Sequence, residues 1–221
     1  MSSSIRVLVP ALLALVAMPA LAAAQACLGS PSFATNHLQL AGSFMFSSDF
    51  EELGAGFTSG SNSYFGGLGI SSYAFDGSDA NVRLGGRLGS QVPVSASGRV
   101  QACPLLSASY GLTTKDYNGT GGDLHTQSYG LGLAIGGELM RSNRVALVPS
   151  VSATVLRDVF RVTGGLAPTD DQDTYILAGA AVGIVLSDAL AIRPAVAFPI
   201  NAAFDEPVFS IGLVLNYGGR R

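Results

Sequence analysis

The sequence predicts an all-β fold, an antiparallel up-and-down transmembrane β-barrel of about ten strands. Apolar residues recur at every second position in one segment after another, which is the period of a strand with one apolar face. Mean hydropathy is high at +0.40, yet beyond the N-terminus no apolar run reaches the roughly 18 residues that a membrane helix needs. Tight turns alternate along the chain with acidic and partly longer connections, which is the organisation of membrane barrels.

The N-terminal residues predict export. Arg6 supplies the positive charge of a signal peptide, residues 7–20 supply its apolar stretch, and the alanines at 22–26 offer small-residue cleavage sites. The expected organisation is a cleaved signal peptide at 1–26, a periplasmic N-terminal segment at 27–36, a barrel at 37–217 and a C-terminal tail at 218–221.

The predicted strands share an outward face of large apolar residues and an inward face of small or polar ones. In chain order they span 37–47, 52–60, 63–75, 81–92, 99–113, 124–140, 145–156, 174–187, 190–202 and 207–217. This even number places both chain ends on the side of the tight turns. The pattern is weakest within 52–75, and if that stretch is not two strands, an eight-strand barrel is the alternative.

The outward faces in the first half of the barrel are defined by four of these strands. The residues are Leu38, Leu40, Phe44 and Phe46 in the first strand, Leu53, Ala55 and Phe57 in the second, Val82, Leu84 and Leu88 in the fourth, and Val100, Pro104, Leu106, Tyr110 and Leu112 in the fifth. Glycine, serine and alanine at the alternate positions suit a narrow lumen, which has little room for side chains.

The second half repeats the pattern. The residues predicted to face outward are Tyr129, Leu131, Leu133, Ile135 and Leu139 in 124–140, Val145, Leu147, Val151 and Val155 in 145–156, and Phe209, Ile211, Leu213, Leu215 and Tyr217 in 207–217. An open sheet of such strands would leave its edge amides unsatisfied in hydrocarbon, so closure is expected. A lipocalin-like barrel, apolar inside and charged outside, is the alternative, but most of its outward charges are missing.

The cysteines, Cys27 and Cys103, leave two alternatives open. An even count in an exported protein favours a disulfide, whereas cleavage just before Cys27 would suit a lipidated cysteine, for which Ala24 is a small residue at the position three before. On the predicted alternation, Cys103 faces the lumen near the turn at 95–98. At about 3.3–3.6 Å per residue, the segment after Cys27 can span the mouth of a small barrel. We predict a disulfide that folds this segment into the mouth and partly closes it.

Four charged residues are predicted to face the lumen, namely Arg83, Arg87, Glu138 and Arg193. An isolated charge there is costly unless it is paired or hydrated. Glu138 lies shortly before one tight turn and Arg193 shortly after another, so we predict that they pair and form a salt-bridged plug. A hydrated narrow channel is the alternative.

Acidic residues gather in or beside the predicted loops. They are Asp49, Glu51, Glu52, Asp76, Asp79, Asp116, Asp123, Asp170, Asp171, Asp173, Asp205 and Glu206, whereas Arg99, Arg141, Arg144, Arg220 and Arg221 gather at the opposite end. Solvated rims explain this distribution. An acidic rim that shares divalent cations with lipopolysaccharide phosphates, or that filters cations at a pore mouth, is the sharper interpretation.

The last predicted strand carries a motif, Ser210-x-Gly212-x-x-Leu215-x-Tyr217, followed by Gly218–Arg221. It resembles the terminal signal that barrel-assembly machinery recognises in bacterial outer-membrane proteins, which usually ends at the aromatic residue. The mature chain as a whole resembles the small bacterial outer-membrane β-barrel superfamily. This resemblance implies the outer membrane of a Gram-negative-type bacterium, contact with its lipid and lipopolysaccharide, and a monomer.

Other functions find little support in the sequence. The net charge of −3 and the lack of a basic run disfavour nucleic-acid binding. His37 and His125 are the histidines, and no G-x-S-x-G motif occurs, so we expect no enzyme, cofactor or metal site. We predict a structural, membrane-stabilising barrel, with a narrow porin for small solutes or hydrophobic compounds and a surface adhesion or interaction protein as alternatives.

Overall fold

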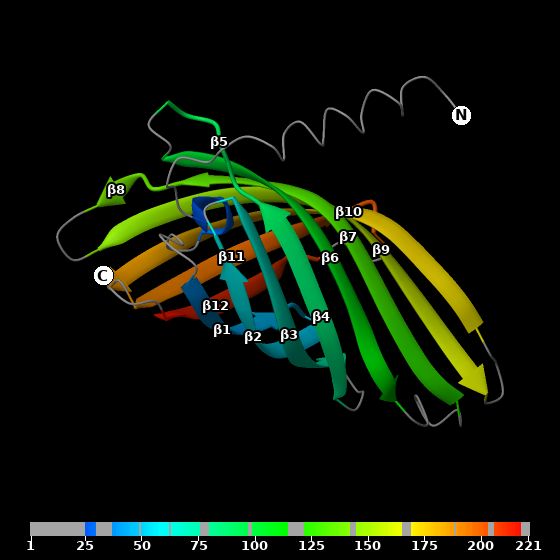
Figure 1. The fold of residues 1–221 in the computed structure, drawn as a ribbon. Coiled ribbons are helices and arrows are strands. Elements are labelled where there is room, and N and C mark those ends of the chain that lie inside the picture. The colour runs from blue at the N-terminus through cyan, green and yellow to red at the C-terminus, as the bar shows by residue number, and fades with distance from the viewer. Residues whose placement is uncertain are drawn as a thin grey trace, which may run out of the picture.

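The computed structural model is a closed antiparallel barrel, which confirms the predicted fold class (Figure 1). It describes residues 25–29, 37–48, 50–61, 63–75, 80–96, 99–114, 122–141, 145–164, 169–187, 189–202 and 206–217. Residues 1–24, most of the segment 27–36 and the tail 218–221 lie outside this set, so the signal peptide stays a prediction.

Ten long strands form the wall. They are β1 (His37–Phe46), β2 (Phe50–Gly60), β3 (Tyr64–Phe75), β4 (Asn81–Ser90), β6 (Val100–Thr114), β7 (Gly122–Gly137), β9 (Ala146–Gly164), β10 (Thr169–Ser187), β11 (Leu190–Ile200) and β12 (Val208–Tyr217). Each pairs with the next in sequence, and β12 pairs with β1 to close the barrel. Two-residue strands β5 (Val92–Pro93) and β8 (Met140–Arg141) pair with β6 and β9.

Large apolar side chains cover the outside of the wall, as predicted. On β12, Ile211 is 51% exposed and Leu213 46% exposed, whereas Val214 between Leu213 and Leu215 is 6% exposed. A face this apolar is compatible with hydrocarbon and not with water. Within the described ranges, no helix is long and apolar enough to cross a membrane.

The strands differ in length around the barrel. We call the part with the four longer strands the high side and the rest the low side. Strands β6, β7, β9 and β10 have 15–19 residues, whereas the other six have 10–12. The longer strands, green to yellow in Figure 1, project past the others at the end that carries the loops. A span of about 9–11 tilted residues crosses a bilayer, so the high side extends beyond it.

The prediction that 164–173 is a loop is wrong, because β10 begins at Thr169. Arg157 and Arg161 on β9 bond to Gln172 and Asp170 on β10. Polar cross-strand pairs therefore continue the ladder after the apolar alternation stops. We call the end with these long projections the loop end, and the opposite end, with the connections at 61–63 and 188–189, the turn end.

Candidate functional site

A short 3-10 helix, η1 (Gln25–Leu28), lies inside the turn end of the lumen. It contacts β6, β7 and β9, and a disulfide joins Cys27 to Cys103 on β6 with a Cα–Cα distance of 5.9 Å. Both cysteines are at most 1% exposed. The predicted disulfide is confirmed, and because the sulfur of Cys27 is bonded to Cys103, the lipidated alternative does not apply to this structure.

Apolar side chains surround the disulfide and complete a floor across the lumen. Cys27, Leu28, Phe65, Cys103 and Ala134 form one buried cluster, against which Leu105 packs. A second cluster fills the neighbouring part of the turn end and consists of Ala146, Val148, Val185, Ala191 and Val214. The described part of the N-terminal segment, residues 25–29, which we call the plug, thus lies inside the turn end of the lumen. That it partly closes the barrel stays a prediction.

Two glycines let the plug approach the wall. Gly29 has a positive φ of 64°, a conformation that favours glycine. Its carbonyl oxygen points at β10, where a Cβ on residue 183 would lie only 2.1 Å away. Gly183 is therefore required for close contact between the backbone of the plug and the backbone of the wall.

Replacing Gly183 with alanine should displace Gly29 and η1 from their contact with β10. The clash involves a backbone carbonyl rather than a flexible side chain, so we expect a loss of about 1–3 kcal/mol in unfolding free energy and faster reduction of the disulfide in the folded barrel. Gly85→Ala is the matched control, because its new Cβ would meet Ser109 Cβ at an ordinary 3.4 Å. Equal reduction rates in the two variants would contradict the close contact.

Above the floor the lumen holds a cavity of about 790 Å³. It runs from Cys27, Leu28 and Arg193 at the floor to Ser47 and Glu206 at the loop end. One side, on β2 and β4, carries the charged residues Glu52 and Arg83. The rest of the lining includes the apolar residues Leu105, Leu156, Phe160, Leu177, Ala195, Ala197 and Val208, and with them the charged Asp158 and Arg193. We call this cavity, with η1 at its turn end, the cup.

The charged side of the cup contains an ion pair that the sequence analysis missed. Arg83 Nη1 lies 3.3 Å from Glu52 Oε2, and the guanidinium of Arg83 stacks 4.3 Å above the ring of Tyr73. Glu52 faces inward from β2, whereas the prediction placed it in or beside a loop, at the first residue of the strand 52–60. Because Leu53 and Ala55 face outward, the alternation of that strand could have revealed the inward orientation of Glu52.

The Arg83–Glu52 pair should show strong coupling in a double-mutant cycle. Arg83→Met or Glu52→Gln alone leaves one charge in the lumen without its partner. The two single changes together should therefore lower the unfolding free energy by more than the double change does. We expect a coupling free energy of about 0.5–3 kcal/mol. The control is the Arg161–Asp170 pair, whose side chains are 57% and 60% exposed, where coupling below about 1 kcal/mol is expected. Additivity at both pairs would contradict the lumen pair.

The other predicted lumen charges are separated. Arg87 donates to Thr58 Oγ1 at 2.9 Å, whereas Glu138 follows the end of β7, where its backbone N–H donates to the carbonyl of Arg99. The predicted Glu138–Arg193 pair is not among the ion pairs of the described residues. Arg193 lies instead at the floor of the cup, beside η1.

No family model matches the sequence, and no curated protein matches it. Among solved structures, the N-terminal β-barrel domain of Pseudomonas aeruginosa OprF is 11% identical with a TM-score of 0.41, covering 83% of this chain and 98% of that chain. LpxR from Salmonella typhimurium is 10% identical with a TM-score of 0.42, over 81% and 99%. The KdgM porin, in complex with oligogalacturonate, is 7% identical with a TM-score of 0.41, over 81% and 99%.

These structures are outer-membrane β-barrel proteins with different roles. The fold of this chain, a closed antiparallel β-barrel, rests on its own strand pairing. The likeness concerns the fold alone, so the role of this barrel has to be argued from its own residues.

The terminal motif lies on β12, and its residues alternate between the lumen and the outside of the barrel. Ser210 and Gly212 face the lumen, and Leu215 and Tyr217 face outward with exposed fractions of 36% and 55%. Recognition by barrel-assembly machinery stays a prediction.

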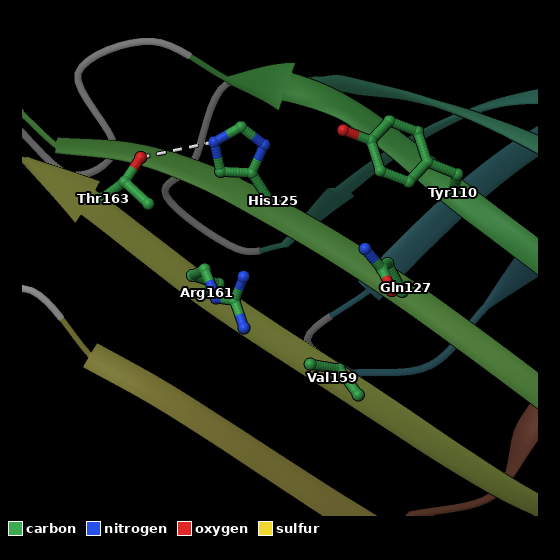
Figure 2. A pocket seen from close by; sticks show the side chains of 6 residues that line it. All are labelled: Tyr110, His125, Gln127, Val159, Arg161 and Thr163. Atoms are coloured by element: carbon green, nitrogen blue, oxygen red, sulfur yellow. Dashed lines mark hydrogen bonds between the residues drawn. The ribbon is translucent and has the colours of Figure 1, made fainter.

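A smaller pocket of about 320 Å³ lies on the outside of the high side, across β6, β7 and β9 (Figure 2). Its six lining residues are Tyr110, His125, Gln127, Val159, Arg161 and Thr163. His125 Nε2 lies 3.3 Å from the Thr163 hydroxyl, as Figure 2 shows. In the described part of the chain, no group of three or more His, Cys, Asp or Glu side chains is placed to hold a metal ion.

Proposed function

We propose that this chain is a structural barrel of a Gram-negative-type outer membrane, and that its lumen does not conduct solutes while the disulfide holds η1 in place. The observation that carries the proposal is the floor of the cup. Cys27 and Leu28 pack against Phe65 and Ala134 across the lumen, and the covalent bond to Cys103 fixes them there. A pore needs a continuous aqueous path, and an apolar, covalently tethered floor interrupts it.

The wall is also built for rigidity. Each of the ten strands is paired on both sides, because β12 closes onto β1, and the Arg83–Glu52 pair connects β4 to β2 across the lumen side of β3. Closed pairing leaves no edge amide to be satisfied within the hydrocarbon. These features favour a membrane-stabilising role that needs neither a cofactor nor a catalytic site.

The outer pocket extends this proposal to the contacts between the barrel and lipid. On β9 the outward face is apolar up to Val155, and beyond it Arg157, Arg161 and Thr163 are polar while Val159 is apolar; on β7 the outward residues are polar on the loop-end side of Tyr129, at Gln127 and His125. We propose that this boundary lies level with the head groups of the outer leaflet and that the pocket around Arg161 contacts lipopolysaccharide. We further propose that barrel-assembly machinery inserts the chain, which then works as a monomer.

Single-channel recording in planar bilayers tests the proposed function. We expect the oxidised protein to give a quiet bilayer, and the same preparation treated with a reductant to give conductance events when η1 leaves its seat. Defined steps from the oxidised protein would instead favour the narrow porin. Folding is verified in each case by heat-modifiable gel migration.

A further inference from the structure

Arg193 is a cation at the floor of the cup that pairs with no carboxylate of the described residues. Its Nε is buried and has no hydrogen-bond partner, and no carboxylate of the described residues lies within 4.0 Å of its guanidinium. A charge in such surroundings is costly unless an opposite charge compensates it.

None of the three acidic side chains that line the cup pairs with Arg193, although Asp158 Oδ1 is buried without a hydrogen-bond partner. Glu52 pairs with Arg83, Asp158 accepts the hydroxyl of Tyr175 at 2.9 Å, and Glu206 at the loop end accepts from Ser48. We expected Glu138 beside Arg193 from the sequence. That place is therefore open to an anion from outside the protein.

The walls above Arg193 define what the rest of that anion must be. From the floor to the loop end, small and apolar residues line the cavity on two neighbouring strands, with Ala181 and Leu177 on β10 and Ala195 and Ala197 on β11, whereas β9 contributes Ser150, Ser152 and Thr154 before Leu156. The volume of about 790 Å³ is in the range of small-molecule sites, about 300–1,000 Å³. An apolar stripe that leads to one buried cation suits a molecule with an apolar tail and a single negative head.

We propose that the cup binds a single-chain amphiphile with an anionic head group, with the head at Arg193 and the tail along β10 and β11. The ligand enters from the loop end, where Ser47 and Glu206 line the cavity. The inference rests on the proposed function, because only a closed floor retains the head group instead of passing it through the barrel.

Titration calorimetry with octanoate tests the site, using the folded, oxidised protein in amphipol and amphipol alone as the blank. Octyltrimethylammonium and octanol share the tail and replace the head. Hydrogen bonds to a charged group contribute about 1.5–3 kcal/mol, so octanoate should bind at least about tenfold tighter than either. Arg193→Gln should remove this preference and Arg193→Lys should keep most of it.

Two further variants separate the site from general effects. Arg99→Gln makes the same charge change at an exposed arginine outside the lumen and should leave octanoate binding unchanged. Ala195→Phe fills the apolar stripe and should weaken all three probes. Wild-type and Arg193→Gln proteins that bind octanoate equally, or a folded wild-type protein that shows no preference for the anion, would overturn the inference.

Bilayer recordings on the same preparations keep the two proposals distinguishable. A quiet bilayer with no octanoate binding overturns the amphiphile site and leaves the plugged barrel standing. Conductance from the oxidised protein overturns the plugged barrel, and Arg193-dependent octanoate binding in that preparation would still support the site.

Discussion

Replacing Cys27 and Cys103 with serine should lower the unfolding free energy of the barrel by about 2–5 kcal/mol, the usual cost of removing a native disulfide. The bond joins residues separated by 76 positions, so it closes a long loop and restricts the unfolded chain strongly. The chain-entropy treatment gives about 3 kcal/mol for a 15-residue loop and about 4.7 for a 100-residue loop, which places this bond near the upper end.

The double serine variant should also lose the closed floor. Without the bond, η1 is held by the packing of Leu28 and by the contact between Gly29 and Gly183, so the plug should leave the lumen part of the time and conductance events should appear. The measurements are urea unfolding in lipid vesicles and planar bilayer recording. Wild-type protein in a reductant is the matched control and should behave like the variant. An unchanged unfolding midpoint together with a quiet bilayer would show that the disulfide neither stabilises nor closes the barrel.

The strands could be predicted because lipid imposes a simple rule on each of them. Every second residue meets hydrocarbon, so Leu38 to Phe46 on β1 and Phe209 to Tyr217 on β12 carry their orientation in their own sequence. The disulfide followed from the same rule, since the alternation points Cys103 inward at the end where the N-terminus begins.

The upper strand segments escaped prediction because water imposes no such rule. Beyond the bilayer, Arg157, Arg161, Asp170 and Gln172 form cross-strand pairs, and a polar strand then has the composition of an acidic loop. Pairing partners become visible only when the register between β9 and β10 is known.

The contacts inside the lumen depend on the register of the whole barrel, which local patterns do not contain. Arg83 and Glu52 meet although β3 lies between their strands, because both side chains reach into the lumen. Glu138 and Arg193 were paired on their distance from tight turns, but η1 occupies the turn end of the lumen between the strands that it contacts. A plug that comes from outside the barrel sequence changes which charges can meet.

The outward face of β12 should tolerate a charge much less than its inward face. Leu213 is near the middle of the strand, is 46% exposed on the outside and lies between Gly42 of β1 and Ile192 of β11. An arginine at the bilayer midplane of a barrel costs about 2–4 kcal/mol, so Leu213→Arg should reduce insertion and the yield of the folded form.

Ser210→Arg is the matched control on the same strand, because Ser210 lines the cavity of the lumen, where a long side chain can reach water. Heat-modifiable gel migration measures the folded fraction of each variant. Equal assembly of the two variants would mean that β12 does not present Leu213 to lipid, and the inside and outside of the barrel would then have to be exchanged.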